Sequence, residues 1–234
     1  FLHGSLNDYF FVAPFVAFVA MTFSKPFYLK KFGGDFHNDY AVAPAWKRSG
    51  ITWAMKRAKG LYWELKAQIK FGKRFNRNSL WAPNTRVKTE YRRPKGDYKR
   101  RFVFMSHVRK EKGVDEMLEA FRRLGSEYSL DIYGTLMGYI PDQLDGRYRG
   151  KVEARDVSSV LAQYDLLLLD SWKEGYPGII IEAYGVGLPV VASNAGGIPE
   201  IVEESVNGVM TEPHSADKLI EAIKRIESLD YDKL

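Results

Sequence analysis

Two glutamates, Glu174 and Glu182, lie eight residues apart in a stretch that also contains Gly175, Pro177 and Gly178. Small residues allow a ligand to approach backbone N–H groups, and the N-terminus of a helix beginning near Gly178 would attract a phosphate. One turn further along such a helix, the Glu182 carboxylate can accept hydrogen bonds from a sugar diol. The residue types and their spacing therefore suit a phosphorylated sugar, whereas a glycine-rich turn with two surface glutamates is the alternative when the stretch is taken alone.

Apolar runs and helical spacings alternate at short intervals in the second half of the chain. Strands are predicted at residues 101–105, 128–133, 165–169, 189–192 and 209–210, and helices at 114–124, 156–164, 178–184 and 215–226. Asp156 and Ser215 are the expected N-caps of two of these helices. This alternation indicates an α/β fold in which helices cover both faces of a parallel, Rossmann-like sheet. Ligands of such sheets bind beyond the carboxyl ends of the strands, so the loops after strands are where a site is expected.

The first half of the chain is less regular. We expect a helix over residues 10–23, a strand at 26–30, a mostly helical segment at 46–71 and a short strand at 80–82. Residues 86–98 are polar, contain Pro94 and Gly96 and have few apolar side chains to bury, so we interpret them as a linker. This interpretation gives one domain at residues 1–85 and a second at residues 99–234.

The composition is that of a folded chain. Of the 234 residues, 45% are hydrophobic, which is enough for a buried core and excludes a disordered chain. Cysteine is absent, which excludes disulfides, thiolate nucleophiles and cysteine-based metal sites and fits a reducing cytoplasm.

Charge is divided unevenly along the chain. Residues 1–100 contain 20 lysines and arginines against 6 acidic residues, whereas residues 101–234 contain 15 against 23. The basic half can face nucleic acid, an anionic lipid surface or an anionic substrate, and a solvated basic surface is an equally good explanation.

The longest apolar run covers residues 10–23 and is interrupted by Pro14. Its fourteen residues fall short of the roughly 20 that span a bilayer. A buried helix is the favoured interpretation. A segment at the membrane surface is the alternative, because aromatic residues crowd the run and basic residues follow it.

The whole stretch of residues 174–208 resembles the donor-binding signature of retaining GT-B glycosyltransferases of family 4, the glycosyl transferases group 1 set. That signature combines two glutamates separated by seven residues, a strand with the pattern Gly-x-Pro-Val-Val-Ala and a Gly-Gly-x-x-Glu loop. Here these are Glu174 and Glu182, GLPVVA at 187–192 and GGIPE at 196–200, followed by Asn-Gly at 207–208. So many spaced elements make chance a poor explanation.

The resemblance implies a role for each residue of the signature. Glu174 would contact hydroxyls of the donor sugar and position it in the catalytic site, and Glu182 would hold the nucleotide ribose. The backbone of Gly175, Tyr176 and Gly178 would approach the sugar and the diphosphate.

The family also places basic side chains after the first strand of this domain, in a Gly-Arg…Lys-Gly pattern. Residues 106–113 read SHVRKEKG, so Lys112 and Gly113 match the end of the pattern, whereas His107 stands where the arginine is expected. Histidine is only partly charged near neutral pH and lacks the guanidinium fork. Arg109, two residues further on, is the expected substitute, and an ordinary solvated lysine is the alternative for Lys112.

A looser similarity concerns the acceptor site. Asp35 and His37 follow a predicted strand, at a place where the family has a histidine near the acceptor. The alternative is that Asp35 only stabilises a turn. The chain contains no Walker loop and no HExxH motif, so no metal is expected.

For the whole chain, the resemblance implies a GT-B-like fold, in which two Rossmann-like parallel-sheet domains face each other across a cleft. Compared with that plan, the chain is expected to be a fragment. The first strands of the N-terminal, acceptor-side domain would lie upstream of Phe1, and a terminal helix would follow the helix that ends near Ile226.

The implied activity is transfer of a sugar from a nucleotide-diphosphate-sugar donor to a glycan or lipid-linked acceptor, with retention and without metal or cofactor. It would serve cell-surface glycan or polysaccharide synthesis in the cytoplasm, with peripheral contact at the inner face of the membrane through the basic half and no nucleic acid partner. Two alternatives stay open: a non-catalytic nucleotide-sugar-binding module, and a basic membrane- or polyanion-binding protein on a GT-B scaffold.

Overall fold

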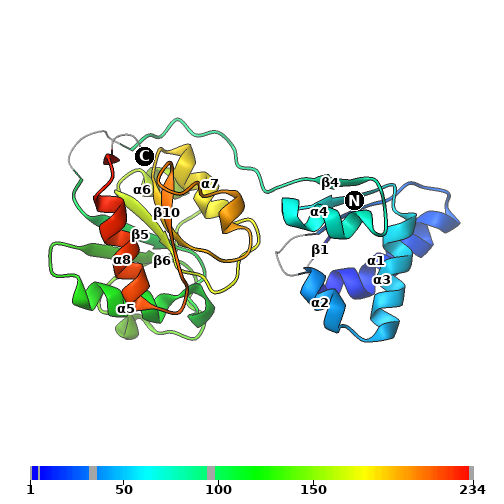
Figure 1. Cartoon of the computed structure of the whole chain (residues 1–234), viewed down its shortest axis with the longest axis horizontal. Helices are drawn as coiled ribbons and strands as arrows, with labels where there is room; N and C mark the ends of the chain where they lie inside the picture. Colours follow the sequence, from blue (N-terminus) through cyan, green and yellow to red (C-terminus); the bar gives the residue numbers. More distant parts are fainter. Residues whose placement is uncertain (1, 5, 32–35, 94–97, 232–234) are drawn as a thin grey trace. The chain divides into compact units, whose positions relative to one another are not determined.

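The computed structural model describes residues 2–4, 6–31, 36–93 and 98–231 and divides the chain into two compact units, residues 1–84 and 85–234. Each unit is built from parallel strands joined by helices (Figure 1). The α/β fold class expected from the sequence is confirmed. Asp35 falls outside the described residues.

The second unit contains a sheet of six described strands, all of them parallel. They are β5 (Arg101–Met105), β6 (Ser129–Tyr133), β7 (Tyr148–Gly150), β8 (Leu166–Leu169), β9 (Val190–Ser193) and β10 (Gly208–Thr211). Their order across the sheet is β10-β9-β8-β5-β6-β7. From β5 the chain adds β6 and β7 on one side. It then crosses to the other side of β5 and adds β8, β9 and β10. The gap between the loops after β5 and β8 is therefore the topological switch point, where α/β sheets bind ligands.

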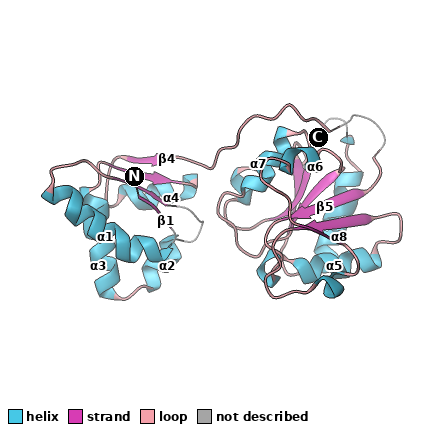
Figure 2. Ribbon diagram, turned by 180° about the vertical axis from the view of Figure 1, so that it is seen from behind, coloured by secondary structure: helices cyan, strands magenta, loops and turns pink. Residues whose placement is uncertain are grey.

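Helices cover both faces of this sheet (Figure 2). They are α5 (Val114–Arg123), α6 (Val157–Leu161), α7 (Gly178–Gly185) and α8 (Ala216–Glu227), with single 3-10 turns at Lys110–Lys112, Pro141–Leu144 and Ile198–Glu200. Helix α5 packs beside α8, and α6 packs beside α7. Ser215 caps α8 as expected, since its side chain accepts a hydrogen bond from Lys218 N at 3.2 Å.

Asp156 stands at the N-cap position of α6, as expected, but its side chain does not cap the helix. Its carboxylate makes no hydrogen bond to the first turn of α6 and instead pairs with Arg155 Nε at 3.5 Å. Asp156 is exposed, so its carboxylate is already satisfied by water and by the neighbouring guanidinium.

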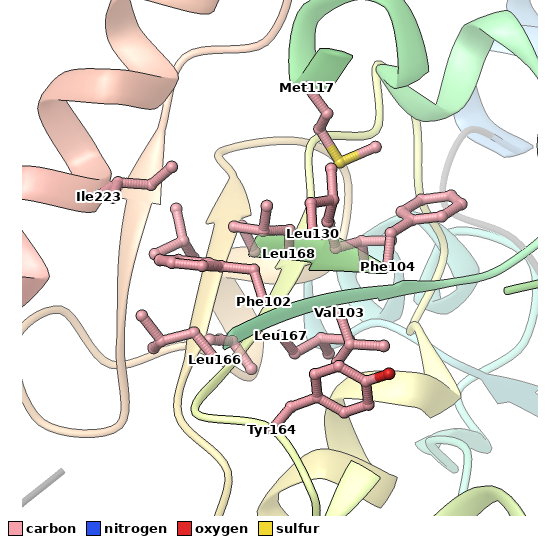
Figure 3. Close-up of a cluster of buried hydrophobic side chains, with 14 of the residues drawn as sticks. Phe102, Val103, Phe104, Met117, Leu130, Tyr164, Leu166, Leu167, Leu168 and Ile223 are labelled. Atoms are coloured by element: carbon pink, nitrogen blue, oxygen red, sulfur yellow. The ribbon is translucent and has the colours of Figure 1, made fainter. Parts of the chain in front are cut away.

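The strands carry the hydrophobic core of the second unit. Every residue of β8 is buried, as expected for a parallel strand covered on both faces. Figure 3 shows Phe102 and Phe104 of β5 on the side of Met117 and Ile223, with Val103 and Tyr164 on the opposite side. The core therefore fixes β5 and β8 side by side and holds the ends of both strands in place.

The first unit has a smaller sheet of four described parallel strands in sequential order. They are β1 (Leu2–Gly4), β2 (Tyr28–Lys31), β3 (Gly60–Trp63) and β4 (Ser79–Trp81), joined by α1 (Leu6–Thr22), α2 (Phe36–Val42), α3 (Ala45–Arg57) and α4 (Lys66–Lys73). Its core is aromatic, because the buried Phe36 ring lies 5.5 Å from that of Tyr9 and 5.6 Å from that of Trp63.

The mostly helical segment expected at residues 46–71 is wrong in its centre. Gly60–Trp63 form strand β3, which pairs with β2 and β4 and separates α3 from α4. A short apolar run in a strand covered on both faces carries no alternation, so its spacing cannot be distinguished from that of a buried helix. The backbone hydrogen bonds to β2 and β4 stabilise residues 60–63 as a strand and not as a helix.

Helix α1 begins earlier than expected and runs through Pro14 without ending there. In the described part of the chain, no helix combines the length and the apolar character that crossing a membrane requires.

Gly113 lies where the loop after β5 packs closely against the loop after β8, so a substitution there tests whether the two loops can separate. It has a φ of 72°, and a Cβ at this position would lie 2.1 Å from the backbone oxygen of Asp170. Gly138 also has a positive φ, 92°, but a Cβ there would meet nothing within 4 Å. We expect Gly138→Ala to cost about 1 kcal/mol of unfolding free energy for the left-handed backbone alone. Gly113→Ala should cost at least about 2 kcal/mol more, because a backbone oxygen cannot move aside as a side chain does.

Urea unfolding of the two variants measures this difference. Equal losses of stability would show that the loops after β5 and β8 have room to separate.

Candidate functional site

The candidate site lies at the carboxyl ends of β5 and β8, where two loops meet. Trp172 N donates to the carbonyl of Glu111 at 2.9 Å, which joins the loop after β8 to the loop after β5. Gly113 packs against the backbone of Asp170 at the same junction. The switch point of the sheet is thus closed by direct contacts between the two loops.

A nearly buried ion pair links the same loops. Lys112 Nζ pairs with Oε1 of Glu174, and the two side chains are only 11% and 10% exposed. Ser171 Oγ donates to the same carboxylate oxygen at 2.7 Å, and Ser193 Oγ donates to the carbonyl of Ser171 at 2.5 Å. Glu174 is therefore held in one orientation by a cation, a hydroxyl and the end of β9.

The glycine loop at residues 196–200 supports Glu174 from another direction. Gly196 has a φ of 56°, and a Cβ there would lie 1.9 Å from the backbone oxygen of Glu174. A side chain at this position would push the loop away, so glycine is required for the contact. Two parts of the sequence signature thus pack directly on one another.

Helix α7 begins at Gly178, directly after this loop, and presents backbone N–H groups at its first turn. Pro177 precedes the helix without capping it by a side chain, and Ile180 N donates to the carbonyl of Pro177 at 3.2 Å. Glu182 lies one turn along α7 and accepts a hydrogen bond from Arg86 Nε at 2.5 Å. The sequence carries no signal for this contact, because Arg86 is one of many basic residues in a polar segment.

A cavity of about 380 Å³ opens beside this helix start. His107 and Ser106 from the loop after β5, Thr135 from the loop after β6 and Glu182 from α7 are among its lining residues. The fold therefore brings His107 and Glu182, which are 75 residues apart in the sequence, to one cavity.

The other predicted site residues are placed as follows. Gly175 and Tyr176 lie half-buried between Glu174 and α7. Arg109 pairs with Glu111 at 3.9 Å, and its Nε is buried without a hydrogen-bond partner. His37 lies exposed in α2 of the first unit.

Among the residues that the structure describes, no group of three or more His, Asp or Glu side chains is placed to hold a metal ion.

Comparison with known proteins identifies the family. Residues 99–228 match the profile of the family described as glycosyl transferases group 1. The chain belongs to this family. The matched residues contain the whole of the sheet of the second unit and the candidate site on it.

Several relatives of this glycosyl transferases group 1 chain have known names. It is 29% identical over 150 residues to the amylovoran biosynthesis glycosyltransferase AmsK of Erwinia amylovora, covering 56% of this chain and 37% of that protein. It is 26% identical over 135 residues to the N-acetyl-alpha-D-glucosaminyl L-malate synthase of Bacillus anthracis, covering 52% and 35%. The chain thus spans little more than a third of the length of these curated relatives.

Solved structures share the fold of the chain. Anabaena HepE in complex with UDP matches 98% of this chain and 69% of its own with a TM-score of 0.78 at 18% identity. Sucrose-phosphate synthase from Thermosynechococcus elongatus matches 93% and 63% with a TM-score of 0.72 at 15% identity. These likenesses support the GT-B-like architecture expected from the sequence.

Asp170 is a feature of this site that the sequence did not reveal. It is fully buried directly after β8, and neither carboxylate oxygen has a hydrogen-bond partner. Burial, and to a smaller extent the nearby Glu116, raises the pKa of Asp170 to about 8. The carboxyl group is therefore neutral in the folded protein at neutral pH.

This raised pKa predicts a pH-dependent stability. The folded state keeps the Asp170 proton up to about pH 8 while the unfolded state loses it near pH 4, so burial of this group destabilises the fold progressively between those values. Asp170→Asn should remove that slope. Relative to the parent, its unfolding free energy should rise by about 2 kcal/mol or more between pH 5 and pH 8.

Urea unfolding at both pH values measures the effect, with Asp156→Asn as the exposed control that should show none. A parent-to-variant difference that stays constant with pH would contradict a neutral Asp170.

Proposed function

We propose that this chain is part of a glycosyltransferase that transfers a sugar from a nucleotide-diphosphate-sugar donor to a glycan or lipid-linked acceptor. The observation that carries the proposal is the joining of Lys112 and Glu174 at the switch point of the sheet, beside the first turn of α7. A nucleotide-diphosphate sugar needs a positive cradle between two groups that accept hydrogen bonds from hydroxyls. Lys112 and the α7 N-terminus form the cradle, and Glu174 and Glu182 are the two acceptors.

The solved structures support a nucleotide-sugar donor. Anabaena HepE has been crystallised with UDP and with UDP-glucose. In the present chain, the donor diphosphate would lie over Gly178, its ribose at Glu182 and its sugar at Glu174.

The reaction is proposed to proceed with retention and without a metal or other cofactor. As the bond to the sugar breaks, negative charge develops on the diphosphate. Lys112 and the N–H groups of α7 would stabilise that charge electrostatically. Glu174 positions the donor sugar, and its orientation is fixed by Lys112 and Ser171. The reaction would serve cell-surface glycan or polysaccharide synthesis, and the similarity to AmsK, an amylovoran biosynthesis glycosyltransferase, supports this role.

Glu182→Ala tests the donor site. Loss of a charged acceptor for the ribose diol should weaken binding of UDP or GDP, whichever the parent binds, by about 1–3 kcal/mol. Calorimetric titration of the whole chain measures this loss. Glu119→Ala, which removes an exposed glutamate from α5, is the matched control and should bind as the parent does. Parent protein that binds neither nucleotide, or a silent Glu182→Ala, would contradict the ribose assignment.

Binding without turnover would favour the alternative of a non-catalytic nucleotide-sugar-binding module. In the proposed function the protein acts in the cytoplasm, in part at the inner face of a membrane. The first unit, which carries His37, would bind the acceptor.

An exposed apolar face on α1 favours the membrane contact. Phe11, Phe15 and Phe18 follow each other at helical spacing and are 53%, 66% and 62% exposed, opposite the buried side of the helix. Residues 1–84 contain 13 lysines and arginines against 4 acidic residues. Aromatic side chains within a basic surface suit the interface of an anionic bilayer.

The double variant Phe15→Ser/Phe18→Ser tests this contact. The parent should sediment with vesicles containing phosphatidylglycerol, less so at high salt, and the variant should sediment several-fold less. Equal sedimentation of parent and variant, or none by the parent, would contradict the contact.

A further inference from the structure

The segment that begins the second unit follows α7 from one end of the helix to the other. Arg92 Nη1 donates to the carbonyl of Gly185 at 2.9 Å, and Arg93 N donates to the carbonyl of Val186 at 2.7 Å. The far end of the segment is thereby anchored at the C-terminus of α7. Arg86, near the start of the segment, lies at the N-terminus of the helix.

The Arg86 guanidinium covers the first residue of α7. A Cβ on Gly178 would lie 1.7 Å from Nη2 of Arg86 and 2.3 Å from its Cζ, so the guanidinium rests directly on the glycine. A cation at the positive end of a helix is electrostatically unfavourable. The hydrogen-bonded ion pair with Glu182 is the contact that compensates for it.

This ion pair also borders two cavities. The cavity of about 380 Å³ that contains His107 and a neighbouring one of about 760 Å³ that contains Arg155 share Arg86, Val157 and Glu182 as lining residues. The guanidinium occupies Oε1 of Glu182, so a ligand in either cavity that binds this oxygen displaces Arg86 from it.

The other cations around the site are less suited to form two hydrogen bonds to a diphosphate. Arg109, the guanidinium expected from the sequence, lines neither cavity and pairs with Glu111 at 3.9 Å. Lys112 is buried and its charge is balanced by Glu174. His107 is exposed and has no guanidinium fork. Arg86 is 39% exposed at its side chain, so its guanidinium can turn toward a bound ligand, and it already lies on the helix start where the diphosphate is proposed to bind.

We propose that Arg86 is a ligand of the donor diphosphate, and that it exchanges Glu182 for the phosphates when the donor binds. The inference rests on the proposed donor site and adds to it the residue that supplies the missing guanidinium. Bidentate hydrogen bonds to phosphate oxygens replace the pair with Glu182, and the released carboxylate becomes free to accept from the ribose diol. The movement of Arg86 would thus provide a ligand for the diphosphate and at the same time free Glu182 to bind the ribose.

The test compares a nucleoside diphosphate with its nucleoside, using the whole chain and calorimetry. For Arg86→Ala, affinity for UDP should fall about 10- to 100-fold, because charge-assisted hydrogen bonds to phosphate are lost. Affinity for uridine, which has no phosphate, should stay within about threefold of the parent or increase, because Glu182 is no longer occupied. Arg86→Lys, which keeps the charge but not the fork, should fall between parent and Arg86→Ala. GDP with guanosine replaces UDP with uridine if the parent prefers that base.

Arg92→Ala is the matched control, since Arg92 belongs to the same segment but contacts the opposite end of α7; its affinity for both ligands should equal that of the parent. Unchanged or tighter UDP binding by Arg86→Ala would overturn the proposal and show that Arg86 only obstructs the site. Equal losses for UDP and uridine would also overturn it. If the parent binds neither UDP nor GDP, the proposed function itself fails, and this outcome is distinct from both of the others.

Discussion

The buried pair of Lys112 and Glu174 joins the two halves of the Rossmann-like sheet at the place where its strand order reverses. Removing one partner of such a pair leaves an uncompensated charge, at a cost of about 3–5 kcal/mol. The close packing around it depends on glycine, because Gly113 lies against Asp170 and Gly196 lies against the backbone of Glu174. The pair fixes the orientation of Glu174, and α7 begins a short loop later, at Gly178.

Four charged side chains of this site form two ion pairs. Lys112 is paired with Glu174, and Arg86 is paired with Glu182. The first pair is nearly buried and serves as part of the fold, whereas the second lies at the surface of two cavities and can open at low cost. In the proposed function, the diphosphate and the ribose diol of the donor take the places of Glu182 and Arg86 in the weaker pair, while the pair of Lys112 and Glu174 is kept as part of the fold.

The sequence was sufficient for most of the second unit and for little of the first. Strands such as β8 are covered on both faces, so they appear as continuous apolar runs, and the spacing of Glu174 and Glu182 identified the loop and helix that follow. Strand β3 was missed because a short apolar run in a buried strand has no period of its own. The Arg86–Glu182 contact and the burial of Asp170 could not be predicted, because both depend on which distant segments pack together and not on local pattern.

The central claim is that the loops after β5 and β8 and the first turn of α7 form a nucleotide-sugar site. Titration of the isotope-labelled chain with UDP, followed by backbone amide chemical shifts, tests it most directly. With the donor site at this position, the largest changes should fall on residues 106–113 and 174–182 and on Arg86, while amides of residues 1–84 should stay near their starting positions. Changes concentrated on the first unit, or on the surface cavity lined by Met210, Lys218 and Arg225, would contradict it.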